Sequence, residues 1–293
     1  MAFTELLDQS LLSELRRIEI RTRRTIDSDL MGRYRTAFRG SGLVFSDLRE
    51  YQPGDEIKSI HWKVTARTGI PHVKTFDEDR LLNIVLTVDM TRSLIAGGGR
   101  TKHRKALELS ALLAMLGHKG QDSVGLCLFS NRVEEFLAAK RSRGQVQRII
   151  SSLLTHRELA SATDLRPVIT HLRKNLKRAS VIFLISDFFC QDFADELRML
   201  AYKHDVIGCL LKSSFEVNLP RAGIVEFADS ESGERILVDL SSKKVASELV
   251  ALQENRLQKL RELFKGCRAD LIEIEDNVLK PLAELMSRRT KRH

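Results

Sequence analysis

Residues 81–93 read LLNIVLTVDMTRS, and this mainly apolar segment gives the clearest indication of the fold class. The run is apolar up to Asp89, which is typical of a strand buried on both faces of a sheet. A second such run, SVIFLISDFF, occupies residues 180–189 and also leads into a carboxylate, Asp187. Both runs therefore predict central strands with an acidic residue at the carboxyl end.

Helical patterns alternate with further apolar runs on both sides of these strands. We expect helices over residues 102–119, 144–154, 165–177, 193–203, 245–264 and 279–288. We expect strands over residues 123–130, 205–211 and 269–275, an edge strand over 133–139, and a hairpin over 224–240 that turns at Ser232-Gly233. Apolar strands separated by helices indicate an α/β fold, a mainly parallel sheet with helices on both faces.

The chain divides into three predicted segments. Residues 1–28 form a basic helix, because residues 3–26 carry leucines at helical spacing next to several arginines. Residues 29–80 form a β-rich block, since from Gly32 onward glycines, prolines and short alternating stretches indicate turns and strands. Residues 81–293 form the α/β domain.

The charge balance favours acidic partners. The chain has 48 Lys and Arg against 39 Asp and Glu, a net charge of +9. The bases are scattered, aromatic residues make up only 6%, and no nucleic-acid motif appears, which disfavours nucleic acid as the partner. No apolar run is long enough to span a bilayer and the first residues lack a signal-peptide pattern, so we expect a cytoplasmic protein without membrane insertion. The isolated cysteines Cys127, Cys190, Cys209 and Cys267 are expected to be buried reduced thiols.

Oxygen-bearing side chains gather where the predicted strands end. Asp89, Thr91 and Ser93 follow the first central strand, and Asp187 follows the second. Thr163 precedes the helix at 165, where either it or Asp164 is also suited to cap that helix. Ligands of open α/β sheets bind outside the carboxyl ends of the strands, and oxygen donors are what Mg²⁺ prefers. These residues therefore predict a site for Mg²⁺ or Mn²⁺.

Asp89-x-Thr91-x-Ser93, the later Thr163 and the strand-end Asp187 resemble the metal-ion-dependent adhesion site of von Willebrand factor A domains. The family pattern has Ser where this chain has Thr91, which keeps the oxygen. The resemblance implies a von Willebrand factor A-like, Rossmann-like fold. It also implies a metal ion that binds an acidic side chain of a partner protein.

An upstream block resembles the bacterial family called domain of unknown function 58. The block includes Arg49, Tyr51, Gly54, Asp55, Trp62 and Arg67, with Trp62 expected to be a packed aromatic. We expect a structural role for these signature residues. The resemblance implies a non-enzymatic adaptor or co-chaperone that acts with a MoxR-type AAA+ ATPase or its client.

Two alternative functions remain open. A Mg²⁺-dependent phosphoester hydrolase of the haloacid dehalogenase type would need a second carboxylate two residues after Asp89, where this chain has Thr91. The glycines at 97–99 before Lys102 do not have phosphate-loop spacing. A basic nucleic-acid-binding protein is the other alternative.

Overall fold

The computed structural model describes residues 17, 22, 24–39, 44–77, 81–94, 101–156, 162–190, 192–213, 223–228 and 235–291. The amphipathic helix predicted over residues 3–26 lies mostly outside these ranges. Within them, no helix combines the length and the apolar composition that crossing a bilayer requires.

The centre of the described chain is a six-stranded sheet with the order β10-β7-β6-β3-β4-β5. Its strands are β3 (Asn83–Asp89), β4 (Ser123–Phe129), β5 (Val133–Lys140), β6 (Val181–Ser186), β7 (Asp205–Leu211) and β10 (Asp270–Ile274). β5 runs antiparallel to β4 at one edge, while the other neighbours pair in parallel. The predicted mainly parallel sheet is confirmed, and the segment predicted as an edge strand lies at its edge.

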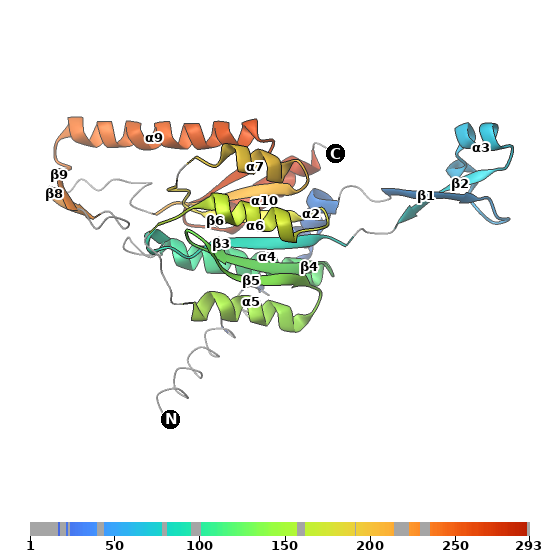
Figure 1. Ribbon diagram of the computed structural model, residues 1–293, viewed down its shortest axis with the longest axis horizontal. Helices are drawn as coiled ribbons and strands as arrows, with labels where there is room; N and C mark the ends of the chain where they lie inside the picture. The colour runs from blue at the N-terminus through green and yellow to red at the C-terminus, as the bar shows by residue number, and fades with distance from the viewer. Residues whose placement is uncertain are drawn as a thin grey trace, which may run out of the picture.

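Helices cover both faces of this sheet (Figure 1). One hydrophobic cluster joins the sheet to α4 (Lys102–Lys119), α5 (Arg143–Thr155) and α10 (Leu279–Thr290). The other joins it to α6 (Leu165–Asn175), α7 (Ala194–Ala201) and α9 (Lys243–Gly266). Neighbouring residues of β3 enter opposite clusters, Leu86 the first and Val85 the second, because side chains alternate along a strand. The apolar runs are therefore buried from both sides, as predicted.

The strand order creates a switch point between β3 and β6. The chain leaves β3 toward β4 and β5 on one side, then crosses to β6 on the other side of β3. In doubly wound sheets, ligands bind at such a point, outside the carboxyl ends of the two strands. Asp89 ends β3, and Asp187 directly follows β6.

Residues 28–39 correct one prediction. They form helix α2 (Ser28–Arg39), whereas turns and strands were predicted from Gly32 onward. Leu30, Tyr34 and Ala37 lie at helical spacing and are buried, and the Tyr34 hydroxyl donates to Asp122 Oδ2 at 2.6 Å. Gly32 lies on the exposed side of the helix. The helix forms because this apolar stripe packs on the α/β domain, beside α10.

The signature residues lie in a small lobe that stands apart from the sheet in Figure 1. The lobe contains the antiparallel strands β1 (Val44–Glu50) and β2 (His72–Asp77), a 3₁₀ turn η1 (Ile57–Ser59) and helix α3 (Trp62–Thr68). Arg49 binds Asp55 through two hydrogen bonds of 2.8 and 2.5 Å, which holds the pKa of Asp55 below its usual range. Gly54 has φ of +113°, which suits glycine in this turn. Arg49, Gly54 and Asp55 thus shape one turn.

The helix of this lobe corrects a second prediction. Trp62 is 65% exposed and is not a packed aromatic, and Arg67 is exposed as well. The reason is that α3 is short and buries none of its side chains. His61, directly before Trp62, caps α3 by accepting a hydrogen bond from the backbone of Val64 at 3.3 Å.

The remaining predictions concern a hairpin, the cysteines and the charge. The hairpin is confirmed as β8 (Ile224–Ala228) paired with β9 (Arg235–Asp239), while its predicted turn at 232–233 lies outside the described residues.

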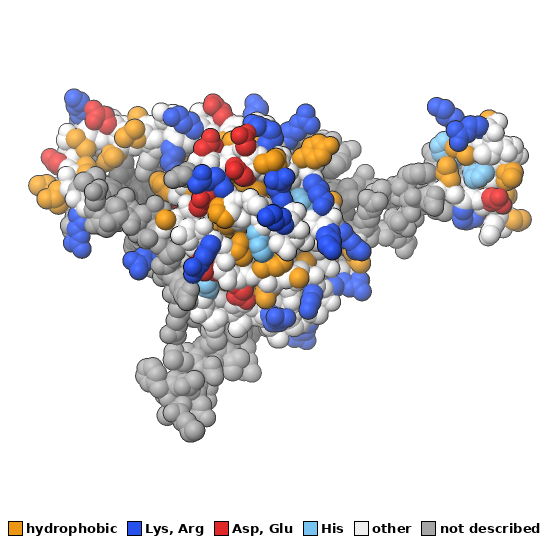
Figure 2. Space-filling view, viewed as in Figure 1, with side chains coloured by type: hydrophobic (Ala, Val, Ile, Leu, Met, Phe, Trp, Pro, Cys, Tyr) orange, Lys and Arg blue, Asp and Glu red, His pale blue; other side chains and the backbone are white. Residues whose placement is uncertain are grey.

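The four cysteines are free thiols, but Cys190 is only half-buried. On the face seen in Figure 2, Lys and Arg side chains are spread over the α/β domain among acidic and hydrophobic ones, as the scattered sequence positions suggested.

Candidate metal centre

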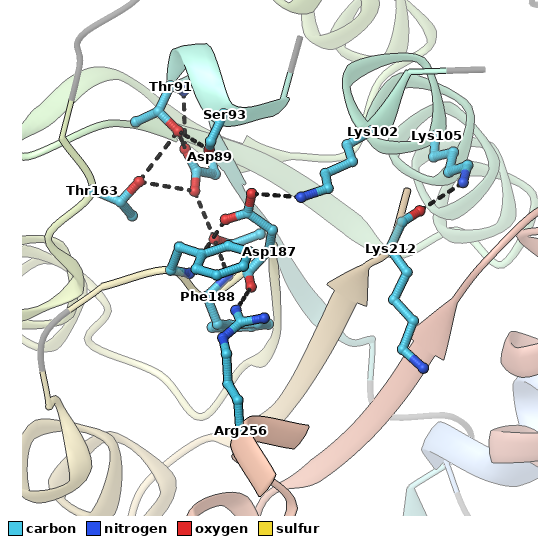
Figure 3. Close-up of polar contacts among 12 residues, drawn as sticks. Asp89, Thr91, Ser93, Lys102, Lys105, Thr163, Asp187, Phe188, Lys212 and Arg256 are labelled. Atoms are coloured by element: carbon cyan, nitrogen blue, oxygen red, sulfur yellow. Dashed lines mark hydrogen bonds and ion pairs between the residues drawn. The ribbon is translucent and has the colours of Figure 1, made fainter. Parts of the chain in front are cut away.

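Five predicted oxygen-bearing residues converge at the switch point (Figure 3). They are Asp89, Thr91, Ser93, Thr163 and Asp187, and we call them the oxygen cup. They come from the end of β3, the 3₁₀ turn η2 (Arg92–Leu94), the segment before α6 and the end of β6. The strands bring them together because β3 and β6 pair in parallel up to Val88 and Ile185, so their carboxyl ends lie side by side.

The carboxylate of Asp89 is fully buried and surrounded by donors. Its Oδ1 accepts from the backbone of Thr91 at 3.0 Å and from the Thr91 hydroxyl at 2.7 Å. Its Oδ2 accepts from the Ser186 hydroxyl at 2.6 Å and from the Thr163 hydroxyl at 3.5 Å. These bonds offset part of the cost of burying a carboxylate at the end of an apolar strand.

The Thr91 hydroxyl also contacts the other two hydroxyls of the cup. Thr91 Oγ1 lies 3.0 Å from Ser93 Oγ and 3.2 Å from Thr163 Oγ1. Thr163 can take this position because Asp164, not Thr163, caps α6, by accepting from the backbone of Arg166 at 3.0 Å. The structure thereby decides between the two capping residues that the sequence left open.

Burial and a second negative charge raise the pKa of Asp89 from its usual 3.8 to about 7. Burial is the larger cause, since it penalises the charged form, and the nearby Asp187 carboxylate adds repulsion. The hydrogen bonds from Ser186 and Thr91 act in the opposite direction. A strongly raised pKa on a buried carboxylate that lies near a second carboxylate is typical of a functional site.

Asp187 is held by contacts that differ from those of Asp89. Lys102, in the first turn of α4, places its ammonium 3.0 Å from Asp187 Oδ2, and the backbone of Phe189 donates to Oδ1 at 3.3 Å. The guanidinium of Arg256, from α9, donates to the Asp187 carbonyl oxygen. Phe188 adopts a left-handed backbone with φ of +52°, and its N–H donates to Ser186 Oγ at 3.0 Å.

Three of these residues were not predicted as part of the site. Ser186 could have been predicted from the sequence, because it stands directly before Asp187 at the strand end. Lys102 and Arg256 could not have been predicted, since they are 85 and 69 residues from Asp187 and only the packing of α4 and α9 brings them near.

The oxygen cup fits a hard divalent cation by its chemistry. It offers two carboxylates and three hydroxyls and no nitrogen or sulfur, and such donors suit Mg²⁺ or Mn²⁺. Among the described residues, no three His, Cys, Asp or Glu side chains gather at one place that could hold a metal ion. A cation in this cup would therefore depend on the hydroxyls together with the two carboxylates.

The strand order, the antiparallel edge strand and the position of the cup define a von Willebrand factor A-like domain. The chain belongs to the family described as "Protein of unknown function DUF58", which matches residues 47–258. The resemblance found in the sequence is thereby confirmed. The family and the fold class together suggest a protein-interaction module.

Other proteins are similar to this chain in sequence or in structure. The uncharacterized protein Rv1480 of Mycobacterium tuberculosis (strain ATCC 25618 / H37Rv) is 30% identical over 230 residues, which cover 77% of this chain and 73% of that protein. An aerotolerance-related membrane protein from Bacteroides fragilis NCTC 9343 has a TM-score of 0.47 at 14% identity, over 72% of this chain and 100% of that chain. The SpRpn10 VWA domain has a TM-score of 0.37 at 11% identity, over 71% of this chain and 95% of that one. The fold class rests on the strand order and not on these distant likenesses.

Proposed function

We propose that this chain is a metal-dependent protein-interaction module whose oxygen cup holds Mg²⁺ or Mn²⁺ and binds an acidic side chain of a partner protein. The observation that carries the proposal is the convergence of two buried carboxylates and three hydroxyls at the switch point of the sheet. In this proposal Asp89 and Asp187 supply the negative charge, and Thr91, Ser93 and Thr163 supply neutral oxygens. When bound, the cation would supply an electrophilic position that an incoming carboxylate can occupy.

We propose binding instead of bond cleavage for this site. Asp89 accepts hydrogen bonds on both oxygens, so it is engaged in holding the cup together. The residue two positions later is Thr91, which cannot act as the second acid or base of a phosphoester hydrolase. Mg²⁺-dependent release of phosphate from p-nitrophenyl phosphate, lost in Asp89→Ala, would favour the hydrolase alternative.

Addition of Mg²⁺ or Mn²⁺ is expected to raise the melting temperature of the wild-type chain. An ion that binds only the native state at roughly 100 times its Kd adds about 2.7 kcal/mol to the free energy of unfolding. For a chain of 293 residues, that corresponds to a rise of about 4–5 °C. Asp89→Ala is expected to show no rise. Thermal denaturation monitored by circular dichroism, with and without EDTA, measures both.

Asp164→Ala is the matched control for this measurement. Asp164 directly follows the cup residue Thr163 in the sequence, but its carboxylate caps α6 and pairs with Arg166. The control is expected to melt earlier than wild type and still to respond to the cation. An unchanged melting temperature in wild type, or an equal rise in Asp89→Ala, would contradict the metal site.

The partner in this proposal is a MoxR-type AAA+ ATPase or its client, as the family resemblance implies. The wild-type chain is expected to bind the purified ATPase from the same genome in Mg²⁺, and at least about tenfold more weakly in EDTA, because a carboxylate contact through the cation would be lost. Asp89→Ala should bind as weakly as wild type in EDTA, and Asp164→Ala as tightly as wild type in Mg²⁺. Biolayer interferometry gives the three affinities, and binding that ignores EDTA would count against a metal-mediated contact.

A further inference from the structure

A buried ammonium lies against one carboxylate of the oxygen cup. The side chains of Lys102 and Asp187 are 5% and 1% exposed, and Lys102 Nζ lies 3.0 Å from Asp187 Oδ2 (Figure 3). A positive charge that belongs to the chain itself therefore already lies against the cup.

The position of Lys102 is costly without that carboxylate. Burial of an ammonium removes it from water, and a cation in the first turn of α4 is opposed by the positive end of the helix dipole. Lys105, in the same helix, is equally buried, but its ammonium donates to the backbone carbonyl of Lys212 at 2.7 Å. Lys102 thus lies against a carboxylate of the cup, whereas Lys105 contacts a backbone carbonyl.

We propose that Lys102 is a tethered cation that neutralises Asp187 in the metal-free protein and lowers the affinity of the cup for a divalent cation. This inference rests on the proposed metal site. Asp187 Oδ2 cannot face an ammonium at 3.0 Å and a divalent cation without strong repulsion between the two cations. Lys102 must therefore move away from Asp187 before Asp187 can serve as a ligand.

The surroundings of Lys102 allow such a movement. A lysine ammonium sits on a flexible four-carbon stem, unlike the rigid guanidinium of arginine. Lys102 Nζ also lies 5.3 Å from the centroid of the Phe189 ring, and this ring is 45% exposed. The same ring holds the Arg256 guanidinium, whose Cζ lies 3.4 Å from its centroid, so Lys102 would turn past this ring toward solvent. The cup would thus load weakly by itself and firmly only when a partner carboxylate completes the site.

The test is a Mn²⁺ titration of the 293-residue chain, in which binding is measured by the loss of the electron paramagnetic resonance signal of free Mn²⁺. Lys102→Met removes the charge and keeps a similar length, and it is expected to lower the Kd for Mn²⁺ about tenfold or more relative to wild type. Lys105→Met is the matched control, because it removes an equally buried lysine of the same helix, and it should keep the wild-type Kd. Lys102→Arg, which keeps the charge, should also bind no more tightly than wild type.

The outcomes separate this inference from the metal site on which it rests. Equal or weaker Mn²⁺ binding by Lys102→Met, with wild type binding, would overturn the role of Lys102 and leave the metal site standing. Absence of binding in both chains at millimolar Mn²⁺ would overturn both. Binding by Lys102→Met alone would be the expected result in its strongest form. Should Lys102→Met fail to fold in circular dichroism, Lys102→Gln is titrated in its place with the same criteria.

Discussion

Replacement of Phe264 by alanine is expected to lower the free energy of unfolding by about 3–5 kcal/mol, the range for truncating a buried aromatic residue. Phe264 is fully buried and lies near the end of α9. Its ring centroid is 5.4 Å from that of Phe188 and 6.2 Å from that of Phe193. It also fills the space left by Gly208 of β7, where an added Cβ would come within 2.5 Å of the ring. The loss would leave a cavity directly beneath the residue that follows Asp187.

Guanidinium chloride unfolding of the metal-free chain measures this effect. Phe264→Leu keeps most of the volume and should cost less than Phe264→Ala. Leu252→Ala is the matched control, since Leu252 belongs to the same helix but is 66% exposed, and a change within about 0.5 kcal/mol is expected. A loss below about 1 kcal/mol in Phe264→Ala would mean that α9 does not anchor this part of the core.

The sheet could be predicted because its strands carry their own signal. β3 and β6 are mainly apolar runs, of which the first ends in Asp89 and the second is followed by Asp187, and this composition is typical of strands buried on both faces. Helix α4 was predicted with the bounds that it has, since its apolar residues recur at helical spacing. The local pattern of apolar residues was thus sufficient to predict an element whose buried positions are all apolar.

Helix α2 and Trp62 show where local patterns fail. Leu30, Tyr34 and Ala37 have helical spacing, but Gly32 and the glycine-rich segment after residue 39 indicate turns. Packing against α10 and the hydrogen bond to Asp122 stabilise the helix, and both depend on residues far along the chain. Trp62 has the composition of a core residue, yet the lobe that contains it is too small to bury it.

The cup could be predicted in part because carboxyl ends of parallel strands meet at one edge. That rule brings Asp89 and Asp187 together without any knowledge of contacts. The charge that balances them could not be predicted, because Lys102 reaches Asp187 only through the way α4 packs on the sheet. Residue type and strand position thus indicate a site, whereas its electrostatics depend on long-range packing.

Replacement of Asp89 by asparagine is expected to stabilise the metal-free chain at pH 8 and to leave it nearly unchanged near pH 3, where Asp89 is protonated in both the native and the unfolded chain. The raised pKa of about 7 means that native Asp89 keeps its proton between pH 4 and 7, whereas the unfolded chain has released it. The free energy of unfolding of wild type therefore falls as the pH rises through this window. Since one pKa unit corresponds to about 1.4 kcal/mol, Asp89→Asn should gain on the order of 2–4 kcal/mol at pH 8. Urea unfolding in EDTA at a series of pH values measures the difference.

Asp164→Asn is expected to change the free energy of unfolding at pH 8 in the opposite direction. The ion pair with Arg166 lowers the pKa of Asp164, so its carboxylate stabilises the native state above the unfolded pKa of 3.8, and that contribution is lost in acid. Asp164→Asn should therefore be less stable than wild type at pH 8, whereas Asp89→Asn is more stable. If Asp89→Asn destabilises the chain at pH 8, the charge of Asp89 must already be compensated within the protein. Lys102 would then balance both carboxylates, and the cup would not need an added cation.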